Sequence, residues 1–415
     1  MIRSTVKMKS SSCYILLLVI SLFYFSYRYV FRWANDMTSG SYSDTPAIVQ
    51  IMKYIICILT VLMSFIFILA NGKTLKIHGN VPLIIFFAFV SSAYAFLNVR
   101  DQNTLMIFIG MSIMFGMCLT IQGDIDFDFL DKLFLFFINV NIVYEFIQIA
   151  LYILRGRLPA IAWANAGLMQ VRFGGIFDDP FALSLFIGFL IPYIYHKYHG
   201  IKRIMYFAIY TVMLILTWTL TSIFALFGVF ILDRLYVLAK KKKWNTITTK
   251  LMLGAIMVGV FFAILYGKPF LDRILKVKRG SIATHLGTHS LDGLSVLTFL
   301  GLAPKAHYAE ASISRLLFTN GIFFTLIFYG LGLCSVRRFR RIIDNLPSEL
   351  MSYKPIFLGM MYYQLAFLIG SINLPFPYMY FNMVVFSIFA GISFVVRTKK
   401  YKLYIQNTEG VSVDS

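Results

Sequence analysis

One stretch of the chain, from Lys268 to Arg315, gathers side chains that can bind anions and transfer protons. Its basic residues and histidines are Lys268, Arg273, Lys276, Lys278, Arg279, Lys305, Arg315, His285, His289 and His307. Arginine offers a planar fork of N–H donors that matches phosphate oxygens, so Arg273, Arg279 and Arg315 are candidates for binding a phosphate or pyrophosphate. Glu310 and His307 are three residues apart, which would place them on one face of a helix, and either could act as a general base.

A second polar stretch, QVRFGGIFDDPFALSLFIGFL, runs from Gln170 to Leu190 and leads into an apolar run. Arg172 has no local structural explanation there, so it is a further candidate for binding an anion. Asp179 directly precedes Pro180, which suits the first turn of a helix. A carboxylate at that place either caps the helix and meets its positive end or accepts a proton, and both interpretations stay open.

The histidines and cysteines do not form a recognisable metal site. His285 and His289 are four residues apart, but Gly287 between them disfavours a helix that would present both to one metal ion. The four cysteines all lie inside apolar runs, without the spacing of a disulfide framework or a CxxC metal site. We therefore expect no metal and no cofactor.

Composition places these polar stretches in a membrane protein. The 415 residues are 59% hydrophobic and 13% charged, whereas soluble domains carry about 25% charged residues. The formal net charge of +20 could indicate nucleic acid, but lysine and arginine also accumulate on the cytoplasmic loops of membrane proteins. We interpret the charge as topology and expect no nucleic-acid partner.

Hydropathy predicts a polytopic, all-α integral membrane protein with about twelve transmembrane helices in a single membrane domain, residues 1–415. The predicted spans are 13–31, 48–70, 81–98, 104–121, 133–154, 181–196, 204–219, 222–238, 251–267, 311–334, 355–373 and 377–396. Basic residues concentrate on alternate connections, which predicts cytoplasmic termini, with 397–415 as a cytoplasmic tail. Two longer connections, 155–180 and 268–310, then lie outside, where positive charge runs against the topological bias.

Two details within the apolar parts are open to more than one interpretation. Glu145 lies inside the fifth predicted span, where an ionisable residue indicates function by default, although Asn139, Asn141 and Gln148 would give the same helix a polar packing face. The segment LSVLTFLGL, from Leu294 to Leu302, is too short to cross a bilayer. It is either an amphipathic segment at the membrane interface or a packed helix that covers a cavity.

Three short motifs resemble the bacterial O-antigen polymerase and ligase superfamily. The first is Arg172 with the following Phe and Gly residues and the acidic residue before Pro180. The second is the TLTS break from Thr219 to Ser222 between two close spans, where Ile223 stands in place of the arginine that family members often carry. The third is EASISRLLFTNGIFFTLIFYG, from Glu310 to Gly330, with Gly321 as the shared glycine. The resemblance also covers the general topology, with one large outer loop in the second half.

Within this superfamily the resemblance favours the polymerases. Ligases share a histidine about eleven residues before the glycine, and here that residue is Glu310, with His307 three residues earlier. The resemblance implies glycosyl transfer at the outer face of the bacterial cytoplasmic membrane. The growing glycan on polyprenyl pyrophosphate, such as undecaprenyl pyrophosphate, would pass to the next lipid-linked repeat unit. The product would be O-antigen of lipopolysaccharide, capsule or exopolysaccharide, and a flippase and a chain-length regulator would be partners.

The implied roles follow from the charge that develops in this reaction. Arg172, Arg273, Arg279 and Arg315 would stabilise the pyrophosphate leaving group. Glu310, His307 or Asp179 would accept the proton of the acceptor hydroxyl. Two alternatives stay open: a ligase that moves finished polysaccharide to another lipid, and a flippase for lipid-linked oligosaccharide. A flippase should instead place its charges along a central cavity through many spans.

Overall fold

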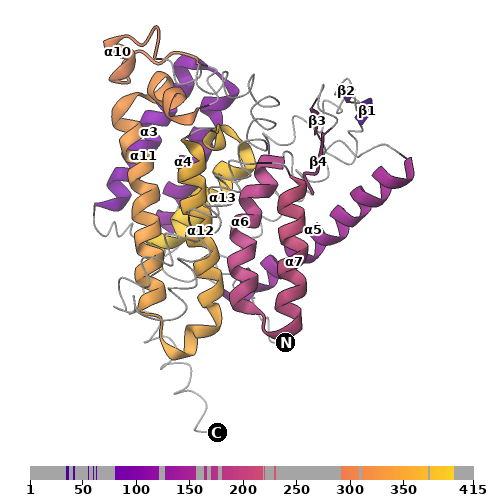
Figure 1. The fold of residues 1–415 in the computed structure, drawn as a ribbon. Coiled ribbons are helices and arrows are strands. Elements are labelled where there is room, and N and C mark those ends of the chain that lie inside the picture. Colours follow the sequence, from indigo (N-terminus) through magenta and orange to yellow (C-terminus); the bar gives the residue numbers. More distant parts are fainter. Residues whose placement is uncertain are drawn as a thin grey trace, which may run out of the picture.

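The computed structural model is a bundle of long helices (Figure 1). It describes residues 34–36, 41–42, 55, 59, 62, 80–120, 127–155, 163–165, 170–175, 180–217, 219, 229, 291–307, 311–372 and 374–396. The helices are α3 (Val81–Val99), α4 (Gln102–Thr120), α5 (Phe127–Arg155), α6 (Pro180–Lys197), α7 (Gly200–Leu216), α10 (Val296–Phe299), α11 (Ser312–Asp344), α12 (Lys354–Ser371) and α13 (Tyr380–Val395). Two 3-10 turns, η1 (Ser348–Tyr353) and η2 (Phe376–Tyr378), flank α12.

Outside these helices and turns, the described residues form two small antiparallel hairpins. The rest of the described part is irregular, apart from a few isolated helical positions. Strand β1 (Ala34–Asp36) pairs with β2 (Ser41–Tyr42), and β3 (Trp163–Asn165) pairs with β4 (Gln170–Arg172). The second hairpin lies in the connection 155–180 and places Trp163 opposite Arg172. The expected helical fold class therefore holds for the described residues, with these hairpins as a minor addition.

Helix length and apolarity are consistent with an all-α membrane protein. Within the described residues, three helical segments are long and apolar enough to cross a membrane: Val81–Val99, Leu130–Leu154 and Ser312–Asp344. Shorter apolar helices cover Thr104–Cys118, Phe181–Lys197 and Asn382–Val395. Large apolar side chains are also exposed on the outside of the bundle, as expected where hydrocarbon is the solvent; Leu97 is 66% exposed and Leu154 is 79% exposed.

A helix overlaps each of the eight predicted spans that fall within the described residues, although several bounds differ. Helix α13 begins at Tyr380 rather than at residue 377, after the turn η2, and α7 begins and ends a few residues earlier than predicted. Helix α5 begins at Phe127 rather than at residue 133, because Asp128 favourably occupies its first turn. Helix α11 continues ten residues beyond residue 334 to Asp344 and carries the Arg337–Arg341 cluster, so those charges lie on a helix rather than in a loop. The spans predicted at 13–31, 48–70, 222–238 and 251–267 lie outside the described residues, apart from isolated positions.

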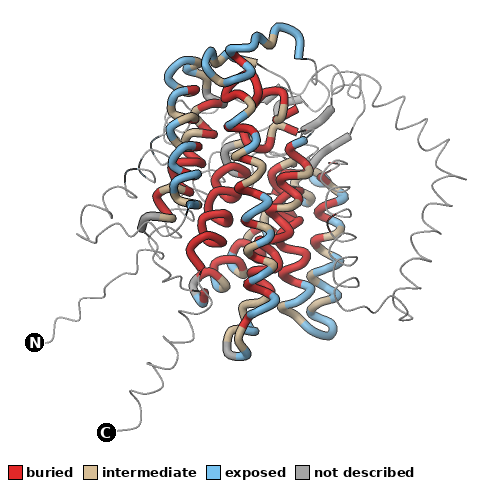
Figure 2. The backbone as a smooth tube through the Cα atoms, turned by 90° about the vertical axis from the view of Figure 1, so that its left-hand side faces the viewer, coloured by how far each residue is buried: buried red, intermediate tan, exposed pale blue. Residues whose placement is uncertain are grey.

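Buried residues gather in the centre of the bundle (Figure 2), where neighbouring helices approach each other closely. A Cβ atom at Gly359 of α12 would lie 2.7 Å from the Phe189 ring of α6. A Cβ atom at Gly332 of α11 would lie 2.6 Å from Leu368 of α12. Small residues let helix backbones approach each other, which matters in membranes because lipid provides no hydrophobic driving force for helix association.

The helix contacts also define the two ends of the bundle. Lys197, the last residue of α6, lies beside Lys354, the first residue of α12, so these helices run antiparallel. At the opposite end, the Ser312 hydroxyl at the start of α11 donates to the Leu374 carbonyl, just after α12. The N-terminal ends of α6 and α11 therefore share one end of the bundle, here called the loop end. Both long connections lead into helices at the loop end (Figure 1).

Candidate functional site

Arg315 is a buried cation in the first turn of α11, at the loop end. Its residue surface is 9% exposed. Its Nε donates a hydrogen bond of 2.9 Å to the His307 carbonyl, and its guanidinium lies 4.6 Å from the centre of the Tyr378 ring. Among the described residues no carboxylate lies within ion-pair distance of it. A buried charge without a counter-ion is costly, so this guanidinium is well placed to receive an anion.

His307 packs directly against this arginine. Its ring stacks on Phe318 with a centroid distance of 4.0 Å and an interplanar angle of 16°. The Lys305 amide donates to the Phe318 carbonyl and fixes the chain on α11. Burial, followed by the charges of Arg315 and Lys305, lowers the pKa of His307 below its ordinary value of 6.5. The imidazole is therefore neutral near pH 7, which is the form that accepts a proton.

Three buried polar side chains complete what we call the Arg315 corner, defined as His307, Arg315, Thr319, Asn320 and Tyr378. The Thr319 Oγ1 lies 2.8 Å from the Arg315 carbonyl oxygen, 2.8 Å from Asn320 Oδ1 and 3.2 Å from the Tyr378 hydroxyl. The Tyr378 hydroxyl can donate its proton to Thr319 Oγ1. Asn320 Nδ2 is buried without a hydrogen-bond partner.

A crossing of two glycines shapes this corner. Gly321 interrupts α11 with φ 80° and ψ 176°, and Gly301 has φ 82°. A Cβ atom at Gly321 would lie 2.4 Å from the backbone nitrogen of Gly301. The segment 291–307 can therefore cross the break in α11 backbone to backbone. The Tyr94 hydroxyl of α3 donates to the Leu302 carbonyl and holds the same segment from the other side.

The segment predicted as a short interfacial or covering helix forms the four-residue helix α10 within this crossing. Ser295 caps it, accepting a hydrogen bond of 3.1 Å from the Thr298 amide. Val296 and Leu302 are largely exposed, whereas Thr298 is buried and bonded to the Ala303 carbonyl. Helix α10 therefore covers the outer part of α11 with one side and presents apolar side chains on the other.

The motif that begins at Arg172 packs against a polar face of α5. A Cβ atom at Gly175, where φ is 58°, would lie 2.5 Å from Asn141 Oδ1 and 3.1 Å from Glu145 Oε2. Glu145 is 2% exposed, and neither of its carboxylate oxygens has a hydrogen-bond partner. Gln148, one turn further along α5, is buried in the same way. Among the described residues these groups have no hydrogen-bond partner, so both interpretations of this face, packing and function, stay open.

The structure brings two of the predicted site residues together, His307 and Arg315. It places Arg172 in β4, in the other long connection at the same end of the bundle. Glu310, Asp179, Arg273 and Arg279 lie outside the described residues. Glu310 and His307 would share a helical face only if that stretch were a helix, and His307 precedes α11, whose N-cap is Ala311, and belongs to no helix. Its link to Arg315 is a hydrogen bond through its carbonyl instead.

Sequence reasoning missed Tyr378, Thr319 and Asn320. Tyr378 falls within the predicted span 377–396, although the prolines at 375 and 377 could have indicated the 3-10 turn that exposes it to Arg315. Thr319 and Asn320 lie one helical turn after Arg315, next to the glycine that the motif comparison singled out. A buried polar pair at that position is a signal that could have been used.

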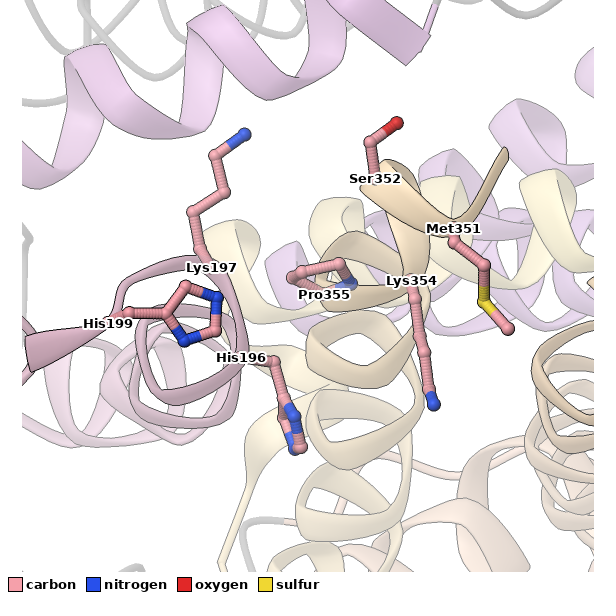
Figure 3. Close-up of a pocket in the computed structure, with 7 residues that line it drawn as sticks. All are labelled: His196, Lys197, His199, Met351, Ser352, Lys354 and Pro355. Atoms are coloured by element: carbon pink, nitrogen blue, oxygen red, sulfur yellow. The ribbon is translucent and has the colours of Figure 1, made fainter. Parts of the chain in front are cut away.

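A basic hollow, shown in Figure 3, lies where α6 ends and α12 begins, at the end of the bundle opposite the loop end. It has a volume of about 330 Å³ and is lined by His196, Lys197, His199, Met351, Ser352, Lys354 and Pro355. The Lys197 ammonium is paired with Asp131 of α5, and the Tyr193 hydroxyl donates to the same carboxylate. Lys197 and Lys354 are among the basic residues of the connections predicted to be cytoplasmic, so this hollow needs no further function.

Acidification is expected to weaken the Arg315 corner through His307. Because the pKa of His307 is lowered in the fold, its neutral form contributes stability that is present above pH 6.5 and lost as the pH falls through the lowered value. Thermal unfolding of the purified protein between about pH 7 and about pH 5 should show a loss that is smaller in His307→Gln. Equal acid sensitivity in the two proteins would contradict this account.

A comparison with protein-family models and with curated proteins found no match to this sequence.

Proposed function

We propose that this protein is a membrane glycosyltransferase that polymerises lipid-linked oligosaccharide repeat units, with twelve spans, cytoplasmic termini and the loop end outside. The observation that carries the proposal is the Arg315 corner. A buried guanidinium without a carboxylate partner among the described residues lies there beside a neutral imidazole. This pairing suits a reaction in which a pyrophosphate leaves and a base accepts the proton of the attacking hydroxyl.

In the proposed reaction one bond forms and one bond breaks at the anomeric carbon of the donor. The hydroxyl oxygen of the acceptor repeat unit attacks the anomeric carbon of the donor glycan, and the bond from that carbon to the pyrophosphate oxygen breaks. Polyprenyl pyrophosphate leaves with the electron pair, and its charge is stabilised by Arg315 and Arg172, with Arg273 and Arg279 as further candidates. The acceptor proton passes to Glu310, His307 or Asp179. Of these bases, His307 is supported by its lowered pKa and its contact with Arg315.

The motif resemblance supports the polymerase branch, since Glu310 stands where ligases have a histidine. A ligase would use the same leaving group and a different acceptor. The product therefore distinguishes the two activities, whereas the Arg315 corner fits both. A flippase is less well supported, because the two candidate arginines that the structure describes, Arg172 and Arg315, belong to segments at the loop end.

Replacing Arg172 by alanine is expected to abolish long glycan chains while the protein stays inserted and abundant. Its loss removes a cation that would stabilise the leaving pyrophosphate, an effect on the order of 10²–10³ in rate. The measurement is a size-resolved gel of surface glycans from cells that carry the variant as their only copy.

The matched control is Arg100→Gln, which removes an exposed arginine from a short connection at the loop end. Control cells should make chains of normal length. Glycan chains of normal length in Arg172→Ala cells would show that Arg172 does not belong to the site.

A further inference from the structure

The segment 291–307 presents an exposed apolar surface around α10, which we call the α10 face. Each of its residues is between 38% and 74% exposed. Thr298, the polar residue between them, is instead buried, and its hydroxyl donates to the Ala303 carbonyl. A surface built for water has the opposite arrangement, so the α10 face indicates contact with a membrane or a partner. The face consists of Val296, Leu297, Phe299, Leu300 and Leu302.

The backbone behind the α10 face pairs its own polar groups, as a backbone in contact with lipid must. The amide of every residue from Thr298 to Ala303 donates a hydrogen bond within the segment, the first of them to Ser295 Oγ. The Leu302 carbonyl accepts from the Tyr94 hydroxyl of α3. Unpaired backbone groups are costly in hydrocarbon, and this pattern avoids that cost along the α10 face.

Helix α11 gives the depth at which the α10 face meets a bilayer. Gly301 crosses α11 at Gly321, and Arg337 begins the basic cluster at the other end of that helix. The helix rises about 24 Å from Gly321 to Arg337 at 1.5 Å per residue. With Arg337 at one surface of a hydrocarbon core of about 30 Å, the crossing lies just inside the other surface. The α10 face, which adjoins the crossing, then lies at the headgroup boundary.

Helix α3 gives a second and independent depth. Tyr94, which holds Leu302, lies about 9 Å along α3 before Arg100, where the helix ends. Tyrosine is enriched at membrane interfaces because its ring is apolar and its hydroxyl is polar. Leu97, between Tyr94 and Arg100, is exposed on the side of α3 that would face lipid. Figure 1 shows α10 at the loop end, above α3 and α11, where both depths place it.

We propose that the α10 face lies in the membrane interface at the loop end, with its apolar side chains among the lipid chains just below the headgroups. Lipid fits this face better than a protein partner does, because the face adjoins the exposed surface of α3 and contains no charged side chain. Insertion holds the segment that carries His307 at headgroup level beside Arg315. The inference requires only that the bundle spans a bilayer, and it does not depend on the proposed glycosyl transfer.

The test measures where a fluorophore on the α10 face lies in a bilayer. The full chain, with its four cysteines replaced by alanine, carries the environment-sensitive dye NBD at Leu297→Cys in vesicles of phosphatidylcholine and phosphatidylglycerol. We expect blue-shifted emission that lipids with a nitroxide near the headgroup lower more than lipids with a nitroxide deep in the chain. Stronger loss to the deep nitroxide, loss to aqueous iodide alone, or no loss to either would overturn the proposal.

Two further labels calibrate the measurement. Leu97→Cys, on the exposed side of α3, should lose emission to nitroxide lipids, and Arg341→Cys, at the exposed charged end of α11, should lose it to iodide. Should the cysteine-free chain fail to fold, a diazirine amino acid at Val296 of the native chain replaces the dye. Its cross-links should then be to lipid. Cross-links to protein alone, or none at all, would overturn the proposal.

A charge on the α10 face provides a matched pair of variants, read by the dye at Leu302→Cys. Leu297→Asp should remove the blue shift and the quenching by nitroxide lipids, because a carboxylate resists burial among lipid chains. Ser295→Asp adds the same charge at an exposed polar position that can still cap α10, so it should leave both signals unchanged. Equal signals from the two variants would contradict insertion of this face.

Discussion

Gly321→Ala is expected to lower the free energy of unfolding by about 3 kcal/mol or more, the largest stability effect that the described residues predict. Gly321 has φ 80° and ψ 176°, a region of backbone conformation that residues with a Cβ rarely adopt. The added Cβ would also lie 2.4 Å from the Gly301 nitrogen, and backbone cannot turn away as a side chain can. The segment 291–307 would have to lift from α11.

Gly330→Ala is the matched control for this prediction. Gly330 lies in the same helix with nothing within 4 Å of an added Cβ, so alanine should be neutral or stabilising by about 0.5–1 kcal/mol. Thermal unfolding of both variants in detergent, followed by size-exclusion elution, measures the difference. Equal stability of Gly321→Ala and Gly330→Ala would show that the glycine crossing is not formed.

Arg315→Ala is expected to give the largest loss of function, on the order of 10²–10³ in the rate of chain extension. The substitution removes the buried cation and leaves the Tyr378 ring and the His307 carbonyl without their partner. Arg315→Lys keeps the charge but loses the planar fork, so it should recover only part of the rate. The measurement is chain extension by membranes that contain equal amounts of folded protein.

Arg337→Ala is the control, because Arg337 is an exposed arginine at the far end of the same helix. It should extend chains at the wild-type rate. A wild-type rate in Arg315→Ala would mean that the buried guanidinium serves only the packing of the corner.

The helices of the described part were largely predictable because apolar runs of membrane length have one main structural outcome. Helix α3, for example, follows the predicted span almost to the residue. The end of α11 was not predictable from hydropathy, because a helix can continue into water once its charged residues leave the hydrocarbon. The small hairpins were not predicted, because strands of two or three residues have no distinctive sequence pattern.

The candidate site was predictable in part. Arg315 and His307 could be selected from residue type and place, because positive charge outside runs against the topological bias. Their contact through a backbone carbonyl could not be derived from spacing, and neither could the approach of Tyr378 from 63 residues further along the chain.

The central claim is tested most directly with the purified full chain in liposomes, supplied with lipid-linked single repeat units extracted from cells in which its gene is deleted. We predict a ladder of longer glycans on the lipid carrier, with no ladder from Arg315→Ala. Single repeat units that stay unextended in the presence of folded wild-type protein, whether they cross the membrane or pass to another lipid, would contradict the polymerase assignment.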